Sequence, residues 1–267
     1  MLPAIFVSHG APTLPLTDVP ARHFLQALGA SLPERPRAIV VVSAHWETMV
    51  PSVNSVATNA TIHDFNGFPE ALYRLAYPAP GSPALAQRVA ELVGAAGMPT
   101  EVDTARGLDH GAWVPLMMMF PDADVPVVQL SVQSHLGPAH HLALGRALAP
   151  LRAEGVLILG SGSFTHDLSQ FRRGIPTEEP AWVSDFAGWF DKALAEHRID
   201  DLIAYRRLAP NAVQNHPTDE HLLPLYVALG AAGDDARIER LHASTTFGVL
   251  RMDAYAFGGA ADLAMAA

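Results

Sequence analysis

The chain has 267 residues, of which 49% are hydrophobic and 16% charged, so it can bury a large core and is not globally disordered. Its net charge of −10, with no run of Lys or Arg, argues against nucleic acid or an anionic membrane as the main partner. Because there is no cysteine, disulfides and thiolate metal sites are excluded, and a metal would need His, Asp or Glu ligands.

The hydrophobic pattern predicts strands that alternate with helices of about a dozen residues. In chain order we expect a strand at 4–8, a helix at about 20–30, strands at 38–44 and about 52–57, a helix at 83–97, a strand near 100–104, a helix at about 112–119, a strand at 125–132, a helix at 138–153, a strand at 156–160, helices at about 180–196, 199–206 and 219–231, and strands at about 237–243 and 246–252. This alternation favours an α/β fold with a mainly parallel central sheet flanked by helices on both faces. No repeat or long polar linker divides the chain, so we expect a single domain over 1–267.

No apolar stretch approaches the roughly 20 residues that a membrane-spanning helix requires. The first residues lack the basic segment of a signal peptide and lead directly into a strand. We therefore expect a cytoplasmic protein without a membrane partner. The oligomeric state is left open, a homo-oligomer included.

Three apolar runs end on, or just before, a histidine: His9, His45 and His166. Ligands of open α/β sheets bind beyond the carboxyl ends of parallel strands, so these imidazoles are expected at one edge of the sheet. Neutral imidazole is the commonest metal ligand and needs an acceptor that fixes its tautomer. Four acids are candidates for that role: Asp109, Asp167, Glu47 and Glu220.

Two further segments place histidines beside acids at helix starts. His110 follows Asp109 between glycines, and residues 215–225 contain His216, Glu220 and His221. A helix that begins at residues 217–218 would put His221 near its first turn. Periodicity alone does not choose among His216, Glu220 and His221 as a ligand.

Other patterns have less specific readings. The cluster of His135, His140 and His141 is expected to lie at a solvated helix start, since adjacent helical residues point in different directions. Residues 160–164 do not match the G-x-S-x-G motif of serine hydrolases, and their glycines are expected to let the backbone turn so that His166 reaches the site. The irregular, aromatic segment 62–69 is typical of an ordered loop that builds or covers a site.

Seven segments together resemble one family, in the family's order from residue 5 to about residue 232. They are 7–12, 43–47, 63–69, 77–81, 107–113, 161–168 and 217–225. The chain resembles the DODA-type (4,5-DOPA extradiol) branch of the class III, LigB-type extradiol ring-cleavage dioxygenases.

The resemblance implies a non-haem Fe(II) enzyme that opens a catechol ring next to its two hydroxyls with O2. It implies that His9, His45 and His221 are the metal ligands, with Glu220 an alternative to His221. It further implies that His166 is the catalytic acid/base and that His110 is a second active-site histidine. The substrate expected is a small aromatic catechol. Three residues are weaker candidates for contact with it: His63, Phe65 and Trp113.

The same residues allow two rival functions. Three histidines with an open position also suit a hydrolytic zinc centre, and Zn(II) outcompetes Fe(II) at nitrogen and oxygen ligands. The other rival is a non-catalytic metal-binding module, which would not need His110 and His166 beside the ligands. Oxygen uptake with catechols after anaerobic Fe(II) loading separates these possibilities.

Overall fold

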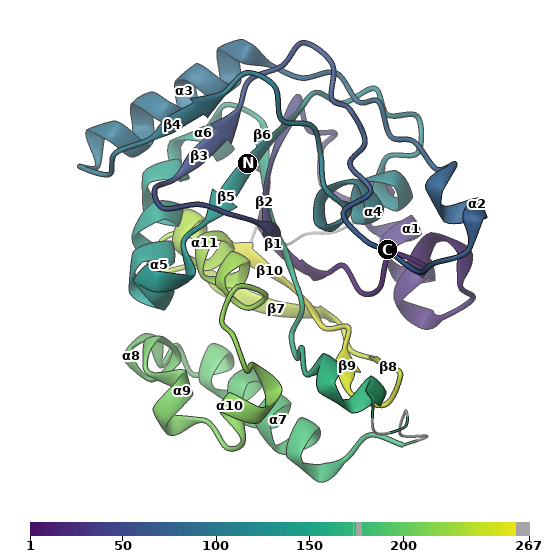
Figure 1. Ribbon diagram of the computed structural model, residues 1–267. Helices are drawn as coiled ribbons and strands as arrows, with labels where there is room; N and C mark the ends of the chain where they lie inside the picture. The colour runs from purple at the N-terminus through teal and green to yellow at the C-terminus, as the bar shows by residue number, and fades with distance from the viewer. Residues whose placement is uncertain (173, 175–177, 260–267) are drawn as a thin grey trace.

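The computed structural model describes residues 1–172, 174 and 178–259, so the last eight residues of the expected 1–267 domain lie outside the described part (Figure 1). Eight strands of this part form one sheet in the order β4-β3-β5-β2-β6-β1-β10-β7. Their bounds are β1 (Ala4–Ser8), β2 (Ala38–Glu47), β3 (Ser52–Asn54), β4 (Glu101–Asp103), β5 (Val127–Val132), β6 (Val156–Gly162), β7 (Arg237–His242) and β10 (Ala254–Gly258). A separate two-stranded sheet pairs β8 (Thr245–Thr246) with β9 (Leu250–Arg251).

The centre of the large sheet is parallel, which confirms the predicted α/β class. Strands β5, β2, β6 and β1 run in the same direction. Antiparallel pairing occurs toward the edges, where β3 meets β5 and where β10 and β7 extend the sheet beyond β1. The parallel core brings the carboxyl ends of β1, β2 and β6 to one edge of the sheet.

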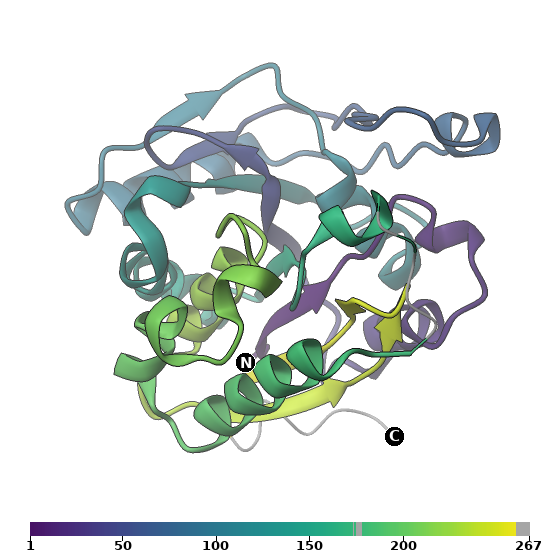
Figure 2. The same cartoon turned by 60° about the horizontal axis from the view of Figure 1, so that its bottom comes forward.

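Helices cover both faces of the sheet, as predicted (Figure 1). One face packs against α3 (Pro83–Ala95), α5 (Gly137–Leu148), α7 (Ala181–Ala195) and α11 (Leu223–Ala232), and the other against α1 (Pro20–Ser31) and α4 (His110–Met119). Successive side chains of β1 serve opposite faces, since Phe6 joins the first core and Ile5 and Val7 join the second. Burial on both faces explains why these strands are continuous apolar runs. Figure 2 shows α7 running alongside the C-terminal strands.

Short helices complete the described part: α2 (Glu70–Tyr73), α6 (Pro150–Ala153), α8 (Ile199–Ile203), α9 (Tyr205–Leu208) and α10 (Ala212–Asn215), with 3-10 turns at Leu14–Leu16, Ser134–Leu136 and Leu168–Arg172. None of the helices in the described ranges is both long and apolar enough to cross a bilayer.

Several predicted elements are wrong in detail, among them the helix expected at about 199–206, which is the two short helices α8 and α9. The helix expected at 138–153 is two helices, because Pro150 has no N–H to continue α5 and instead begins α6. The helix expected from 219 begins at Leu223, so His221 lies in the turn before α11 rather than in its first turn. The strand expected at about 246–252 is only the short pair β8–β9, and the last strand of the large sheet is β10, paired with β1.

The expected solvated helix start is also wrong for His141, which is fully buried. Its Nε2 accepts the backbone N–H of Gln133 at 3.0 Å, so the proton is on Nδ1, which donates to the carbonyl of Gly137 at 2.7 Å. Burial lowers the pKa of His141 to about 3, so the native imidazole is uncharged. Only His135 of this cluster is exposed.

His141 is therefore expected to make the protein acid-sensitive. The unfolded imidazole binds a proton below pH 6.5 while the native one does not until about pH 3, so its stabilising effect is complete above 6.5 and is lost as pH falls through this window. We expect His141→Gln to reduce the pH dependence of the free energy of unfolding by up to about 1.4 kcal/mol per pH unit. Urea unfolding at pH 5, 6 and 7 measures this, with the exposed His135→Gln as control. An unchanged slope in His141→Gln would contradict the assignment.

Candidate active site

Five imidazoles meet at the carboxyl edge of the central strands. His9 directly follows β1, His45 lies in the last part of β2, and His166 lies four residues beyond β6. His110 is the first residue of α4, and His221 precedes α11. The structure thus brings together all five histidines that the sequence singled out for metal binding and catalysis.

Three of these rings turn the same nitrogen toward one point. The Nε2 atom of His45 lies 3.1 Å from Nε2 of His9 and 3.3 Å from Nε2 of His221. Burial lowers the pKa of all three, that of His45 to about 4, so the rings are uncharged at neutral pH. Converging neutral imidazole nitrogens within 4.8 Å of one another are a donor set that fits one divalent metal ion.

The opposite nitrogen of each ring faces an oxygen. Ser161 donates its hydroxyl to the carbonyl of Gly111, so its oxygen accepts from Nδ1–H of His9 at 3.1 Å. Glu220 Oε1 accepts from Nδ1 of His221 at 2.9 Å, and an Asp64 oxygen lies 3.5 Å from Nδ1 of His45. Protons held on Nδ1 leave the lone pairs on the converging Nε2 atoms, which is the tautomer that metal binding requires.

The alternatives to His221 occupy other places. Glu220 lies on the Nδ1 side of His221, away from the contact with His45. His216 is fully buried, and its Nε2 faces the carbonyl of Phe164 at 3.0 Å. Of the three candidates, the geometry favours His221 as the partner of His9 and His45.

His110 and His166 flank the three converging rings. The His110 ring centroid lies 3.8 Å from that of His45. Asp64 accepts from the backbone N–H of His110 and from Nδ1 of the same residue, each at 2.9 Å. Burial alone would raise the pKa of Asp64, but its hydrogen bonds to His110 outweigh this and lower it to about 2. The His166 ring stacks on His221 at 3.4 Å and 15°. Burial lowers the pKa of His166 to about 3, so this ring is also uncharged.

The start of α4 packs closely against β2. Asp109 caps the helix by accepting from the N–H of Ala112, and it also accepts from Ser43 and Gln129. A Cβ on Gly111 would lie 2.4 Å from Ser43 Oγ and 2.9 Å from a ring carbon of His45, so only glycine fits. This close approach sets His110 beside His45.

The glycines of β6 have a different role from the one expected. A Cβ on Gly162 would lie 2.0 Å from the carbonyl oxygen of His221, and one on Gly160 would lie 2.2 Å from that of Pro224. These residues therefore admit the segment that carries His221, rather than turning the chain toward His166. Ser163 completes this contact by donating its N–H to the His221 carbonyl at 2.9 Å.

Of the four acids expected to fix imidazole tautomers, Glu220 is hydrogen-bonded to one of the site's rings. Asp109 caps α4, Asp167 accepts from Ser169 and Gln170, and Glu47 accepts from Ser134. Sequence reasoning missed Asp64 and Ser161 in this role. The signal for Asp64 was its place in the irregular loop 62–69, which was expected to build a site.

A cavity of about 570 Å³ opens onto the imidazoles. His9, His45, His110 and His166 line it, and its apolar wall consists of Phe65, Phe68, Leu168, Phe247 and Leu250. Of the three candidate substrate contacts, only Phe65 is on this wall. His63 faces the carbonyl of Leu75 at 3.0 Å, and the fully buried Trp113 donates to that of Ile62 at 3.0 Å, so neither lines the cavity.

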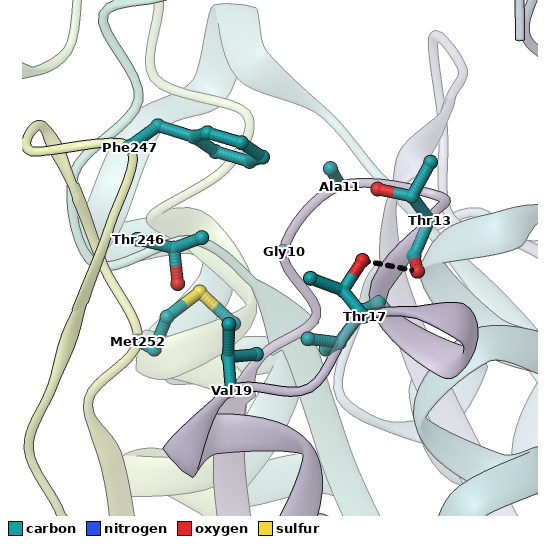
Figure 3. Close-up of a pocket in the computed structure, with 9 residues that line it drawn as sticks. Gly10, Ala11, Thr13, Thr17, Val19, Thr246, Phe247 and Met252 are labelled. Carbon is teal, nitrogen blue, oxygen red and sulfur yellow. Dashed lines mark hydrogen bonds between the residues drawn. The ribbon is translucent and has the colours of Figure 1, made fainter. Parts of the chain in front are cut away.

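A second hollow of about 10 Å³ adjoins the cavity, and Phe247 lines both (Figure 3). Figure 3 shows the Phe247 ring on the side of Thr246 and Met252, reaching toward Gly10 and Ala11. The hollow holds about one water molecule and is too small for a substrate. Gly10, Ala11 and Thr13 line both spaces as well.

Similarity to known proteins identifies the family of this chain. Residues 3–258 match the family model described as the catalytic LigB subunit of aromatic ring-opening dioxygenase. The chain is 47% identical over 258 residues to a 4,5-DOPA dioxygenase extradiol of Beta vulgaris, covering 94% of this chain and 95% of that protein. It is 43% identical to the enzyme of that name from Escherichia coli K12, covering 86% and 85%.

A solved structure has the same fold. The crystal structure of an uncharacterized protein from Escherichia coli K12 superimposes with a TM-score of 0.78 at 35% identity, covering 97% of this chain and 100% of the other. The family match, the extent of these identities and the fold lead to one conclusion. The chain belongs to the LigB family of aromatic ring-opening dioxygenases.

Proposed function

We propose that this chain, as one catalytic domain over 1–267, opens a catechol ring next to its two hydroxyls and adds both atoms of O2 to the product. His9, His45 and His221 would hold Fe(II), and Zn(II) can occupy the same ligands. The observation that carries the proposal is the convergence of three Nε2 atoms beside an aromatic-walled cavity. Cytoplasmic location belongs to the proposal too, and the oligomeric state stays open.

The protein's part in the reaction is to hold the ring and to move protons. A bound ferrous ion would acidify a catechol hydroxyl and allow triplet O2 to react with the closed-shell ring. His166, uncharged because burial lowers its pKa to about 3, begins with a free lone pair and accepts the second hydroxyl proton. The resulting imidazolium returns that proton as the ring opens. His110, whose ring centroid lies 3.8 Å from that of His45, provides a second imidazole beside the proposed metal ligands.

The cavity favours an aromatic substrate. Phe65, Phe68 and Phe247 offer ring faces and edges, and aromatic pairs contribute about 0.5–1.5 kcal/mol beyond area burial. Because the curated relatives are named for 4,5-DOPA, we propose a DOPA-like catechol as the substrate. DOPA differs from simpler catechols in the substituent on its catechol ring, so a panel of substituted catechols distinguishes them.

The test is a panel of catechols on protein loaded anaerobically with Fe(II), with oxygen uptake and ring-opened product followed together. We expect uptake equal to product formed and a preference for one substituted catechol. Absence of uptake across the panel, together with ester or amide hydrolysis by the zinc-loaded protein, would establish the hydrolase instead. Metal binding with neither activity would establish a binding module.

Phe247 gives a separate prediction about the cavity wall. It lies in the β8–β9 turn at φ 53°, a left-handed conformation that costs a non-glycine residue about 1–2 kcal/mol. We expect Phe247→Ala to raise the KM for the catechol about two- to tenfold with little change in kcat, because a stacking surface is lost. Phe247→Gly should be more stable than Phe247→Ala by about 1 kcal/mol in chemical denaturation, since glycine adopts this φ freely. A fall in kcat at unchanged KM would contradict a substrate-holding role.

A further inference from the structure

Asp64 contacts two of the site's imidazoles from the loop that precedes α2. Its Oδ1 accepts the backbone N–H of His110 at 2.9 Å, and its Oδ2 lies 2.9 Å from His110 Nδ1 and 3.5 Å from His45 Nδ1. The Asp64 side chain is only 23% exposed, and the His110 side chain 7%. The two hydrogen bonds from Asp64 to His110 therefore fix the orientation of the His110 ring relative to its backbone.

The direction of these hydrogen bonds fixes the tautomer of His110. An ionised carboxylate only accepts hydrogen bonds, so Nδ1 of His110 must carry the proton that Asp64 accepts. A neutral ring protonated at Nδ1 has its lone pair at Nε2. That lone pair is left for the cavity, which His110 lines.

We propose that Asp64 is a positioning residue that fixes the tautomer of His110, so that its Nε2 faces the cavity as a hydrogen-bond acceptor in the resting enzyme. This inference rests on the proposed ring opening. His110 Nε2 accepts a hydrogen bond from a substrate hydroxyl and so orients the ring for the proton transfer to His166, while the carboxylate of Asp64 holds the proton on Nδ1.

His110 is the nearer partner of Asp64, at 2.9 Å from its Nδ1, whereas Nδ1 of His45 is 3.5 Å away. The competing explanation is that Asp64 merely satisfies the backbone N–H of His110, which has no partner within α4 because it lies at the start of the helix. Asp103 is a matched control for that role, because its carboxylate accepts the backbone N–H groups of Ala105 and Arg106 at 2.8 and 2.9 Å.

The informative variant is Asp64→Asn. Its amide keeps an oxygen for the His110 N–H but presents an NH2 group to Nδ1, which favours the opposite tautomer with the proton on Nε2. We expect ¹⁵N NMR of histidine-labelled, zinc-loaded protein to show the His110 Nε2 signal change from unprotonated to protonated, with His110→Ala identifying the signal. We expect kcat of the iron-loaded enzyme to fall about 10- to 100-fold, while Asp103→Asn keeps the wild-type value.

A double variant tests the route of the effect. If Asp64 acts through His110, adding Asp64→Asn to His110→Ala should change kcat by no more than about twofold. Three results would overturn the proposal. The first is an unchanged His110 tautomer in Asp64→Asn, and the second is an Asp64→Asn effect on kcat that is equally large in the His110→Ala background. The third is a loss of zinc affinity in Asp64→Asn that is larger than its loss of kcat. A wild-type protein that opens no catechol ring would refute the proposed function, yet the NMR result would still decide the role of Asp64.

Discussion

Replacing His166 with alanine is expected to reduce kcat by about 10²- to 10⁴-fold while the protein still binds its metal. The ring lines the cavity, is uncharged because burial lowers its pKa to about 3, and stacks on His221 instead of joining the three converging Nε2 atoms. Removing it should therefore remove a proton carrier and leave the metal ligands in place. Steady-state oxygen uptake and metal content measured on the same samples check both halves of this expectation.

Two further variants separate chemistry from packing at this position. His166→Phe keeps an aromatic ring to stack on His221 but carries no proton, so we expect its kcat to be as low as that of His166→Ala. Added imidazole should restore part of the activity of His166→Ala, because the deletion leaves space for it beside the substrate. His23→Ala, which removes an exposed imidazole paired with Asp18, is the control. If His166→Ala lost its metal, His166 would be a ligand and the proposed acid/base role would be wrong.

Removal of any one of His9, His45 and His221 is expected to weaken metal binding by more than about 100-fold, beyond the 10- to 100-fold typical of residues that only support a ligand. At a metal concentration of 100 times the wild-type Kd, bound metal stabilises the native protein by about 2.7 kcal/mol. A variant with a Kd raised 100-fold would gain only about 0.4 kcal/mol under the same conditions. Thermal unfolding with and without metal, together with metal titration, measures the difference.

Glu220→Gln decides which residue supplies the third ligand. Its amide oxygen can still accept from Nδ1 of His221, so we expect an affinity loss within the 10- to 100-fold range and smaller than that of His221→Ala. His216→Ala should leave metal affinity unchanged, because this ring faces the carbonyl of Phe164. A larger loss in Glu220→Gln than in His221→Ala would make Glu220 the ligand.

Much of the fold could be predicted from hydrophobic runs, because strands buried on both faces must be apolar throughout. Strand β10 was displaced in the prediction because both 246–252 and 254–258 contain apolar residues, and only pairing with β1 distinguishes them. The burial of His141 was missed for a similar reason. A local pattern does not reveal that Gln133 and Gly137 satisfy both ring nitrogens and so allow the ring into the core.

Within the site, the prediction reached the histidines but not their partners. Ser161 was not predicted to contact a histidine, whereas its hydroxyl oxygen accepts from Nδ1–H of His9 and so fixes that tautomer. Asp64 was placed in a loop of unknown contacts, since loop conformation depends on the surfaces that the loop meets. Trp113 was one of the weaker candidates for substrate contact, since an aromatic residue at this position suits the core equally well, and the structure has it in the core.

The sequence alone determined the kinds of donor available, the absence of thiolate ligands and the delivery of His9, His45 and His166 to one edge of a parallel sheet. The first two features follow from amino-acid composition, and the third follows from local apolar runs, which a strand pattern shows without knowledge of distant contacts. Only the tertiary structure decided that His221, 176 residues from His45 in the chain, turns its Nε2 toward Nε2 of His45. It also decided that His166 stacks on the ring of His221. Such choices depend on contacts between distant segments, and on glycines whose missing side chains let those segments meet.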